Sequence, residues 1–207
     1  MHRRGRRAVA KLAAVVGNSG AGKTTLARLL CREGPFAAGL EEHETRPYQR
    51  QFSRGERSAA LPNQMDYLLL RAEQELNLRR GESTAVVDGG LELDYQVFTR
   101  YFHARGYLDE AGFQLCTRLY RLAREALPPP DLILWLRLPV ETAARRLKRR
   151  ARRVEVAGVE DLEALESYLQ AWLAGCEARR VLQVDASPED PDYRAQLPEL
   201  LARIRGL

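Results

Sequence analysis

Residues 17–24 read Gly-Asn-Ser-Gly-Ala-Gly-Lys-Thr and fit the pattern G-x-x-x-x-G-K-T, directly after a short apolar run and before a helical pattern. Glycines in such a loop let backbone N–H groups curl around phosphate oxygens, and the following helix adds the positive end of its dipole. We expect Lys23 to reach the β and γ phosphates and Thr24 to give its hydroxyl to Mg²⁺. The loop therefore predicts a nucleoside triphosphate site made by Gly17, Asn18, Ser19, Gly20, Ala21, Gly22, Lys23, Thr24 and Thr25.

A second group of polar residues follows at spacings that suit an acceptor pocket. Gln64 and Arg71 lie seven residues apart in a helical pattern, so their side chains share one helix face. Asp88 ends an apolar strand, where open α/β sheets bind ligands, and is a candidate for the Mg²⁺ shell. Asp94 and Phe98 follow, one helical turn apart. The phosphate loop alone leaves open whether water or a small hydroxyl compound takes the phosphoryl group, and this second polar set favours a kinase.

The pattern of apolar runs and helical segments predicts one α/β domain over residues 9–207. Expected strands lie at 9–16, 37–40, 84–87, 132–138 and 181–184, and expected helices at 24–31, 63–79, 94–105, 109–127, 140–150, 161–173 and 192–204. Asp109 suits an N-cap, and three prolines at 128–130 stop the helix before them. This alternation indicates a three-layer fold, in which helices cover both faces of a parallel sheet of five strands.

Composition excludes several classes of protein. With 207 residues and 45% apolar content, the chain can bury a full core, so it is not a disordered protein. It holds no apolar run of 18 residues and no cleavage-type signal, and its three cysteines stand far apart. We therefore expect a cytoplasmic protein without a membrane span, a disulfide framework or a zinc site.

Positive charge is concentrated in two stretches. The chain has 33 Lys and Arg against 28 Asp and Glu, with four arginines in residues 3–7 and seven cations in residues 145–153. Clustered cations can bind nucleic acid by neutralising phosphates. We expect instead that residues 1–8 form a solvated, disordered tail and that nucleic acid is not a partner.

The order of these motifs resembles the deoxynucleoside kinase family, within the thymidylate-kinase-like group of P-loop kinases, over residues 9 to about 173. Three family motifs recur: Q-x-x-Y-x-x-x-R at 64–71, [DE]-R-S-x-x-x-D-x-x-x-F at 88–98 without its Arg-Ser, and the lid R-[IL]-x-x-R-x-R-x-x-E at 146–155. The resemblance implies a P-loop fold with an arginine-rich lid at about 145–158. The lid match explains the second basic stretch.

The resemblance also implies catalytic roles. Glu41 stands where the family's second strand ends in a glutamate before a proline-containing loop, and it would accept the proton of the acceptor's 5′-hydroxyl. A one-residue slip would give that role to Glu42. Three lid arginines would close over the donor phosphates and offset the charge on the transferring group: Arg146, Arg150 and Arg152.

The substrate-binding residues follow from the same resemblance. Gln64, Arg71 and Asp94 would read the edge of the base, beside Phe98, and Glu155 would hold the sugar 3′-hydroxyl. An aspartate accepts from an exocyclic amino group, so purine or cytosine nucleosides are expected to be preferred to thymidine. The implied reaction is transfer from ATP, with Mg²⁺, to the 5′-hydroxyl of a deoxynucleoside. The family further implies a homodimer formed through helices such as 63–79 and 109–127.

Departures from the family pattern fall on the acceptor side. Gly89-Gly90 replaces Arg-Ser, and Phe52-Ser53 stands near the family's sugar-contacting tyrosine. Either the substrate is unusual or another arginine, such as Arg100, substitutes. An arginine restored at position 89 is expected to raise activity if the position is merely degraded. The alternatives are a P-loop kinase for another small hydroxyl compound or a nucleoside monophosphate and, from another class, a nucleotide-binding regulatory NTPase module.

Overall fold

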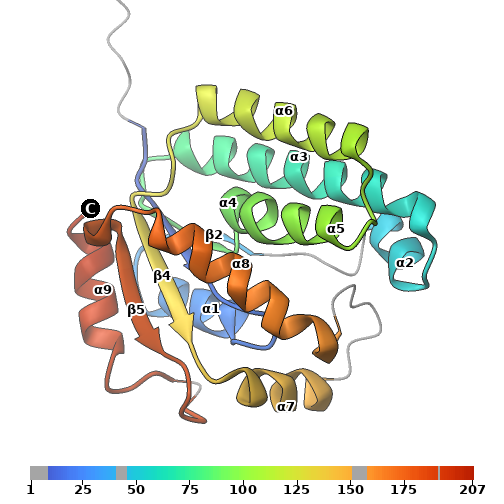
Figure 1. The fold of residues 1–207 in the computed structure, drawn as a ribbon. Helices are drawn as coiled ribbons and strands as arrows, with labels where there is room; N and C mark the ends of the chain where they lie inside the picture. Colours follow the sequence, from blue (N-terminus) through green and yellow to red (C-terminus); the bar gives the residue numbers. More distant parts are fainter. Residues whose placement is uncertain (1–8, 41–45, 151–157, 191) are drawn as a thin grey trace, which may run out of the picture.

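The computed structural model describes residues 9–40, 46–150, 158–190 and 192–207 (Figure 1). Within these ranges five strands form one sheet: β1 (Leu12–Val16), β2 (Ala37–Gly39), β3 (Ala85–Asp88), β4 (Leu132–Arg137) and β5 (Val181–Asp185). Their order is β2-β3-β1-β4-β5, and all neighbours are parallel. The expected parallel sheet is therefore confirmed, with β1 three residues shorter at its start than expected. The expected tail at residues 1–8 lies outside the described residues.

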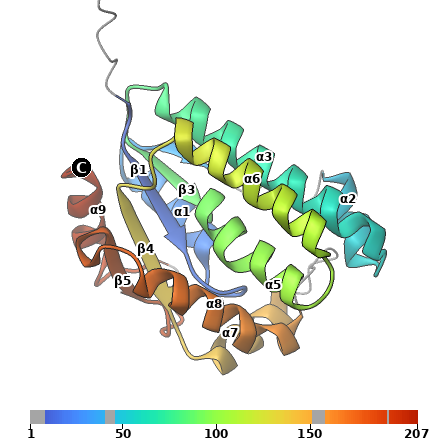
Figure 2. The same ribbon diagram turned by 45° about the horizontal axis from the view of Figure 1, so that its top comes forward.

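Alternation along β1 explains why helices cover both faces of the sheet. Ala13 and Val15 belong to one buried apolar cluster, whereas Leu12, Ala14 and Val16 belong to another. Helices α1 (Lys23–Glu33) and α9 (Leu197–Arg205) close the first cluster, and α3 (Ala60–Arg79), α6 (Glu110–Ala126) and α8 (Leu162–Ala174) close the second. Figures 1 and 2 show these two sets of helices on opposite sides of the sheet. The three-layer arrangement is the expected one.

Of two further helices, one was expected from the sequence and the other was not. α7 (Val140–Arg150) has the expected bounds, and Asp109 caps α6 by accepting from the Gly112 N–H at 2.7 Å. α2 (Pro47–Ser53) was not expected, because the sequence reads as a loop after the second strand; Pro47 stands in its first turn, where a missing N–H costs nothing. No helix within the described ranges is long and apolar enough to cross a bilayer.

Two expected helices are corrected. The single helix expected at 94–105 is instead α4 (Leu91–Leu93), a π-helical segment (Asp94–Thr99) and α5 (Arg100–Ala104). The last helix begins at Leu197 rather than at residue 192. The Asp190 carboxylate accepts from the N–H groups of Asp192 and Arg194, and this local turn competes with helix formation.

Candidate active site

The phosphate loop and Asp88 meet at the carboxyl edge of the sheet. β1 leads directly into the loop, and β3 pairs with β1 in a register that places Val15 opposite Asp88. Helix α1 then begins at Lys23, with Gly22 as its N-cap. Thr24 Oγ1 donates a hydrogen bond to Asp88 Oδ2 at 2.5 Å. The fold thus brings together the two residues that the sequence proposes as Mg²⁺ holders.

The surroundings of Asp88 suit a divalent cation. Asp88 is fully buried, and its Oδ1 atom has no hydrogen-bond partner within the described residues. A buried carboxylate oxygen left without a partner is costly. Hydroxyl and carboxylate oxygens are the ligands that Mg²⁺ takes beside substrate phosphates and water. The Thr24 and Asp88 pair therefore fits this ion.

The phosphate loop has a backbone that only glycine tolerates at its tip. Gly20 has φ +80°, and an ideal Cβ built on it would lie 2.6 Å from the carbonyl oxygen of Ala143 in α7. Lys23 Nζ donates to the carbonyls of Gly17 at 3.1 Å and Asn18 at 3.0 Å. The lysine ammonium therefore lies over the loop that is expected to cradle the phosphates.

The side chain of Asn18 ties this loop to α8. Its Nδ2 donates to the Leu162 carbonyl at 2.8 Å and to Glu166 Oε2 at 3.1 Å, and the residue is 5% exposed. Together with the Gly20–Ala143 contact, this bond holds the loop against both helices that flank the lid segment. Any binding by Asn18 to a donor nucleotide would use its backbone, because its side-chain amide is engaged.

Gln64, Arg71 and Asp94 converge on one buried point. Arg71 Nε lies 2.7 Å from Asp94 Oδ2, and Gln64 Nε2 donates to the Asp94 carbonyl at 3.1 Å and to Thr99 Oγ1 at 2.8 Å. Thr99, which sequence reasoning missed, also donates to the Asp94 carbonyl at 2.9 Å. The wider π-helical turn places Thr99 above Asp94, and a regular helical pattern gives no signal of this contact.

Burial and charge act on Asp94 in opposite directions. Burial raises the pKa of Asp94, and the guanidinium of Arg71 acts to lower it. Oδ2 is engaged by Arg71, whereas Oδ1 has no hydrogen-bond partner in the described part of the chain. The ion pair therefore orients a carboxylate with one free acceptor oxygen.

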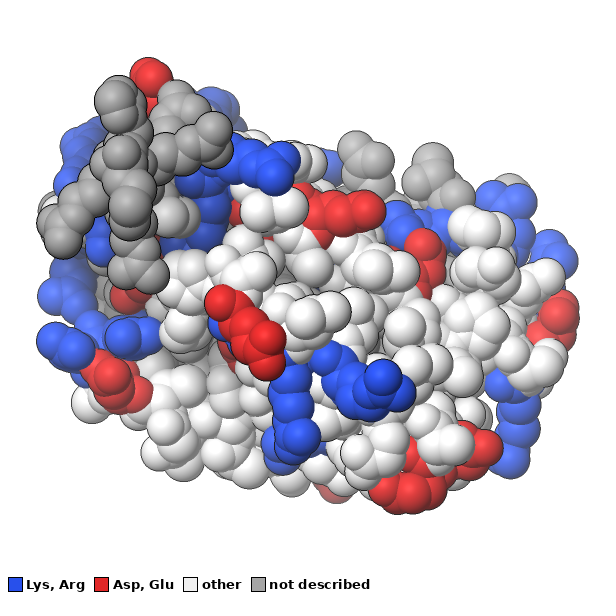
Figure 3. Space-filling view, turned by 90° about the horizontal axis from the view of Figure 1, so that it is seen from above, with Lys and Arg blue, Asp and Glu red and all other residues white. Residues whose placement is uncertain are grey.

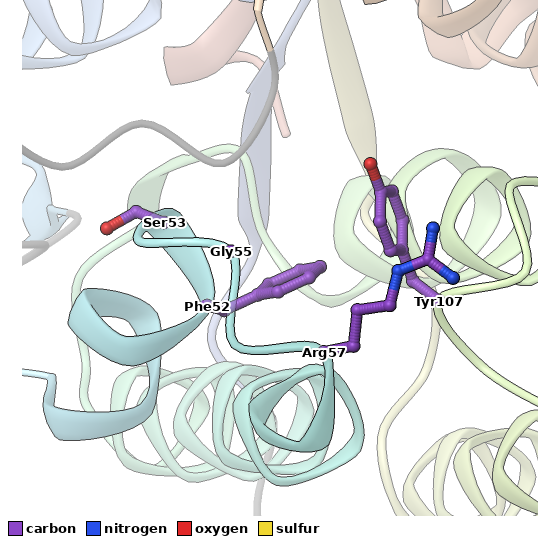
Figure 4. Close-up of a pocket in the computed structure, with 5 residues that line it drawn as sticks. All are labelled: Phe52, Ser53, Gly55, Arg57 and Tyr107. Atoms are coloured by element: carbon purple, nitrogen blue, oxygen red, sulfur yellow. The ribbon is translucent and has the colours of Figure 1, made fainter.

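Aromatic side chains lead from this cluster to a pocket. Phe98 lies 6.2 Å from Phe102, which in turn contacts Phe52 edge-on at 5.2 Å, both distances being between ring centroids. The pocket has a volume of about 280 Å³. Figure 4 shows the ring of Phe52 on one side of it and Tyr107 on the other, with Arg57 beside Tyr107. Its lining residues are Phe52, Ser53, Gly55, Arg57 and Tyr107.

The two glycines that replace the family's Arg-Ser have left-handed backbones. Gly89 has φ +80° and Gly90 φ +94°, a region that residues with a side chain rarely adopt. A Cβ on Gly89 would lie 3.4 Å from Arg71 Nη2. The guanidinium beside position 89 is thus that of Arg71, whereas Arg100 is exposed and lies over the ring of Tyr95.

The lid is described only in part. Arg146 donates to three carbonyl oxygens after β5, those of Ala186 at 2.7 Å, Pro188 at 2.9 Å and Ser187 at 3.3 Å. Its guanidinium is therefore directed at the segment between β5 and α9. The other residues proposed for the lid and for the general base lie outside the described residues: Glu41, Glu42, Arg152 and Glu155. The side chain of Arg150 also lies outside the described part of the structure.

Comparisons with known proteins agree with this arrangement. The family model "Deoxynucleoside kinase" matches residues 13–203. A Bacillus subtilis deoxyadenosine/deoxycytidine kinase is 23% identical over 173 residues, 82% of this chain and 80% of its own length. A B. subtilis deoxyguanosine kinase is 25% identical over 181 residues, 85% and 81% of the two chains.

Solved structures show the same fold. Deoxyadenosine kinase from M. mycoides with bound dCTP superimposes with a TM-score of 0.78 at 22% identity, covering 95% of this chain and 100% of that one. The same enzyme with dCMP and dCDP gives 0.79 over equal coverage. Because the family pattern spans nearly the whole chain, from the first strand to the last helix, this protein belongs to the deoxynucleoside kinase family, enzymes that transfer a phosphoryl group to a nucleoside hydroxyl.

Proposed function

We propose that this kinase transfers the γ-phosphoryl group of ATP to the 5′-hydroxyl of a deoxynucleoside whose base carries an exocyclic amino group. The observation that carries this proposal is the Asp94 carboxylate, held by Arg71 with one oxygen free. That oxygen accepts a hydrogen bond from an amino group of adenine, cytosine or guanine, whereas it repels the carbonyl that thymine presents. The names of the two curated relatives, which include all three of these bases, support the assignment.

The donor side of the reaction is assigned to the phosphate loop. Lys23 would reach the β and γ phosphates, and Thr24 and Asp88 would hold Mg²⁺. The ion, when bound, neutralises charge on the phosphate oxygens. The backbone N–H groups at the start of α1 would add a positive potential at the bound phosphates.

The acceptor hydroxyl needs a base and a closed lid. We assign proton acceptance to Glu41, the sugar 3′-hydroxyl to Glu155, and charge stabilisation to Arg146, Arg150 and Arg152, as the sequence motifs imply. Arginines of a closing lid face the developing charge only in the closed state, so they act on kcat more than on KM. Arg150→Ala should lower kcat by about 10² or more.

A substrate panel tests the proposal. ADP release is measured above the ATP hydrolysis background with four deoxynucleosides, four ribonucleosides and the matching monophosphates. Deoxyadenosine, deoxycytidine or deoxyguanosine should give the highest kcat/KM. If thymidine is the best acceptor, the base-reading assignment is wrong. Activity on monophosphates with none on nucleosides would move the acceptor to the alternative kinase class.

The outer face of α3 and α6 supports a homodimer. Leu69 and Leu76 on α3, and Leu115 and Leu122 on α6, recur at seven-residue spacing and are each more than a third exposed, Leu122 by 64%. Figure 3, which looks down on these two helices, shows uncharged side chains over much of the face. We propose that a second copy of the chain covers this face. A twofold axis would pack the exposed leucines of α3 and α6 against the same leucines of the second copy, so that four helices are in contact.

Light scattering on a sizing column tests the dimer. The wild-type protein should elute with twice the mass of the chain, and Leu122→Glu should shift it to the monomer. Ala202→Glu, on an exposed position of α9 across the sheet, is the matched control and should leave the mass unchanged. A monomeric wild-type protein contradicts the proposal. The cytoplasmic location expected from the sequence stays a prediction.

A further inference from the structure

Tyr193 has an unusual backbone in the segment between β5 and α9. Its φ of +46° is the only positive value at a residue other than glycine in the described ranges. The conformation is held locally, since its carbonyl accepts from the N–H groups of Gln196 at 3.0 Å and Leu197 at 2.8 Å, at the start of α9. A side-chain-bearing residue in this region is unfavourable, and such residues gather at functional sites.

The side chain of Tyr193 points toward the phosphate loop. The residue is only 7% exposed and belongs to the apolar cluster under α1 and α9. Its hydroxyl oxygen would lie 3.4 Å from a Cβ built on Gly22, the N-cap of α1. The aromatic ring is thus buried while the hydroxyl reaches the loop.

That hydroxyl has no hydrogen-bond partner among the residues that the structure describes. It is not one of the solvent-excluded polar atoms of the described residues, so a bound ligand can reach it although the residue as a whole is 7% exposed. Burial raises the pKa of Tyr193, so the phenol keeps its proton and remains a donor. The hydroxyl is therefore available to donate a hydrogen bond to a ligand bound at the phosphate loop.

The chemistry next to the hydroxyl identifies that acceptor. The first N–H groups of α1 have no partner within the helix, and the helix dipole is positive at this end. Gly22 and Lys23 begin the helix at the point where the phosphate loop is expected to hold phosphates. An anionic oxygen bound there would lie within reach of both the backbone N–H groups and the Tyr193 hydroxyl.

We propose that Tyr193 Oη donates a hydrogen bond to a phosphate oxygen of the donor nucleotide and is a further donor-binding residue of this kinase. The proposal rests on the proposed use of a triphosphate at the phosphate loop, and it adds a contact from a segment more than 160 residues away in the sequence. Arg146 bonds to the carbonyls of residues 186–188 in the same segment, so the lid helix helps to position Tyr193.

Equilibrium titration with ATP and Mg²⁺, without any acceptor, tests this contact in Tyr193→Phe. A hydrogen bond to a charged group contributes about tenfold or more to affinity, so the dissociation constant should rise by at least that factor. Without ligand the midpoint of thermal unfolding should not fall, because the variant loses no internal hydrogen bond. Tyr120→Phe is the matched control: it loses a 2.6 Å bond to Glu92, so it should unfold earlier and bind ATP unchanged.

Titration with tripolyphosphate locates the contact. Equal weakening of ATP and tripolyphosphate binding in Tyr193→Phe supports a phosphate contact, whereas weakening for ATP alone overturns it. Unchanged ATP affinity in the variant overturns the proposal, as does a lower unfolding midpoint with unchanged affinity, which marks a structural role. If the wild-type protein does not bind ATP, the proposed donor itself is wrong. The wild-type titration therefore separates failure of the proposed function from failure of the Tyr193 contact.

Discussion

Arg71 and Asp94 form an ion pair 2.7 Å apart in which both side chains are at least nine-tenths buried. The pair joins α3 to the π-helical segment Asp94–Thr99. Gln64 of α3 makes a second contact to the same segment, because its side chain donates to the Asp94 carbonyl. Removing one member of a buried pair costs about 3–5 kcal/mol, because the other charge is left without compensation. The proposed base-reading site and the packing of α3 against this segment therefore depend on the same contact.

Asp94→Asn tests the base-reading role. The variant keeps the shape but replaces an acceptor oxygen, so kcat/KM for the best amino-bearing nucleoside should fall by about 10². The measurement is the ratio of kcat/KM for that nucleoside to kcat/KM for thymidine, because partial unfolding of the preparation lowers both values equally. An unchanged ratio contradicts the assignment. Asp66→Asn, which disturbs a half-buried ion pair with Arg46, is the control and should leave the ratio unchanged.

Lys23→Ala should abolish phosphoryl transfer and leave the fold intact. The Lys23 ammonium donates to the carbonyls of Gly17 and Asn18 in the phosphate loop, and it lies at the ligand side of the sheet rather than in the apolar core. Activity and the circular dichroism spectrum are measured on the same sample. A kcat above about a tenth of the wild-type value contradicts the role of the lysine in transition-state stabilisation. Lys11→Ala, at an exposed lysine directly before β1, should keep full activity.

Gly20→Ala should disrupt the phosphate loop. The new Cβ would stand 2.6 Å from the Ala143 carbonyl, so either the loop or α7 has to move. Gly106→Ala is the matched control, because Gly106 also has a positive φ, +68°, but no atom within 4 Å of the added Cβ. The backbone strain is common to both variants, so a larger loss of unfolding midpoint and ATP affinity in Gly20→Ala measures the contact with α7. Equal losses would show that strain alone matters.

Gly89→Arg should lower activity rather than restore it. The sequence predicts a rise only if the position is merely degraded, but φ of +80° disfavours any side chain, and Arg71 Nη2 already lies 3.4 Å from the Cβ position. A second guanidinium would be forced against the first, so kcat/KM for deoxynucleosides should fall. Gly106→Arg separates backbone strain from this repulsion and should keep activity. A rise in kcat/KM for Gly89→Arg would show that the turn can rearrange.

Asp131 gives the fold a defined acid sensitivity. Partial burial alone would raise the pKa of Asp131, but hydrogen bonds from Lys11 at 2.9 Å and the Leu12 N–H at 3.0 Å outweigh it and lower the pKa. A lowered pKa in the folded state stabilises the protein above the unfolded value of about 4, and this stabilisation is lost as pH falls through the folded value. Asp131→Asn should therefore be less stable at pH 7 and lose less stability between about pH 5 and pH 2. Parallel pH profiles of the two proteins would contradict this account.

The sequence alone determined the features that depend on short stretches of chain. Glycine spacing and a following helical pattern identified the phosphate loop, and apolar runs located all five strands to within a few residues, because burial on both faces leaves no polar position in a strand such as β1. The spacing of Gln64 and Arg71 also foretold that they share a face, since seven residues make two helical turns. These inferences need no contact between distant segments.

Tertiary structure decided what the local pattern could not. A regular helix was expected from Asp94 onward, yet a π-helical turn brings the Thr99 hydroxyl onto the Asp94 carbonyl, and Gln64 of α3 donates to both groups. The sign of φ at Gly89 is likewise not visible in the sequence, and it decides between the two outcomes that the sequence leaves open for an arginine there, because we expect lower activity. Tyr193 reaches the phosphate loop because β5 pairs with β4, the strand next to β1, and because α9 packs against α1. Such contacts join segments far apart in the chain, so their energy depends on the assembled core and not on the pattern of any one segment.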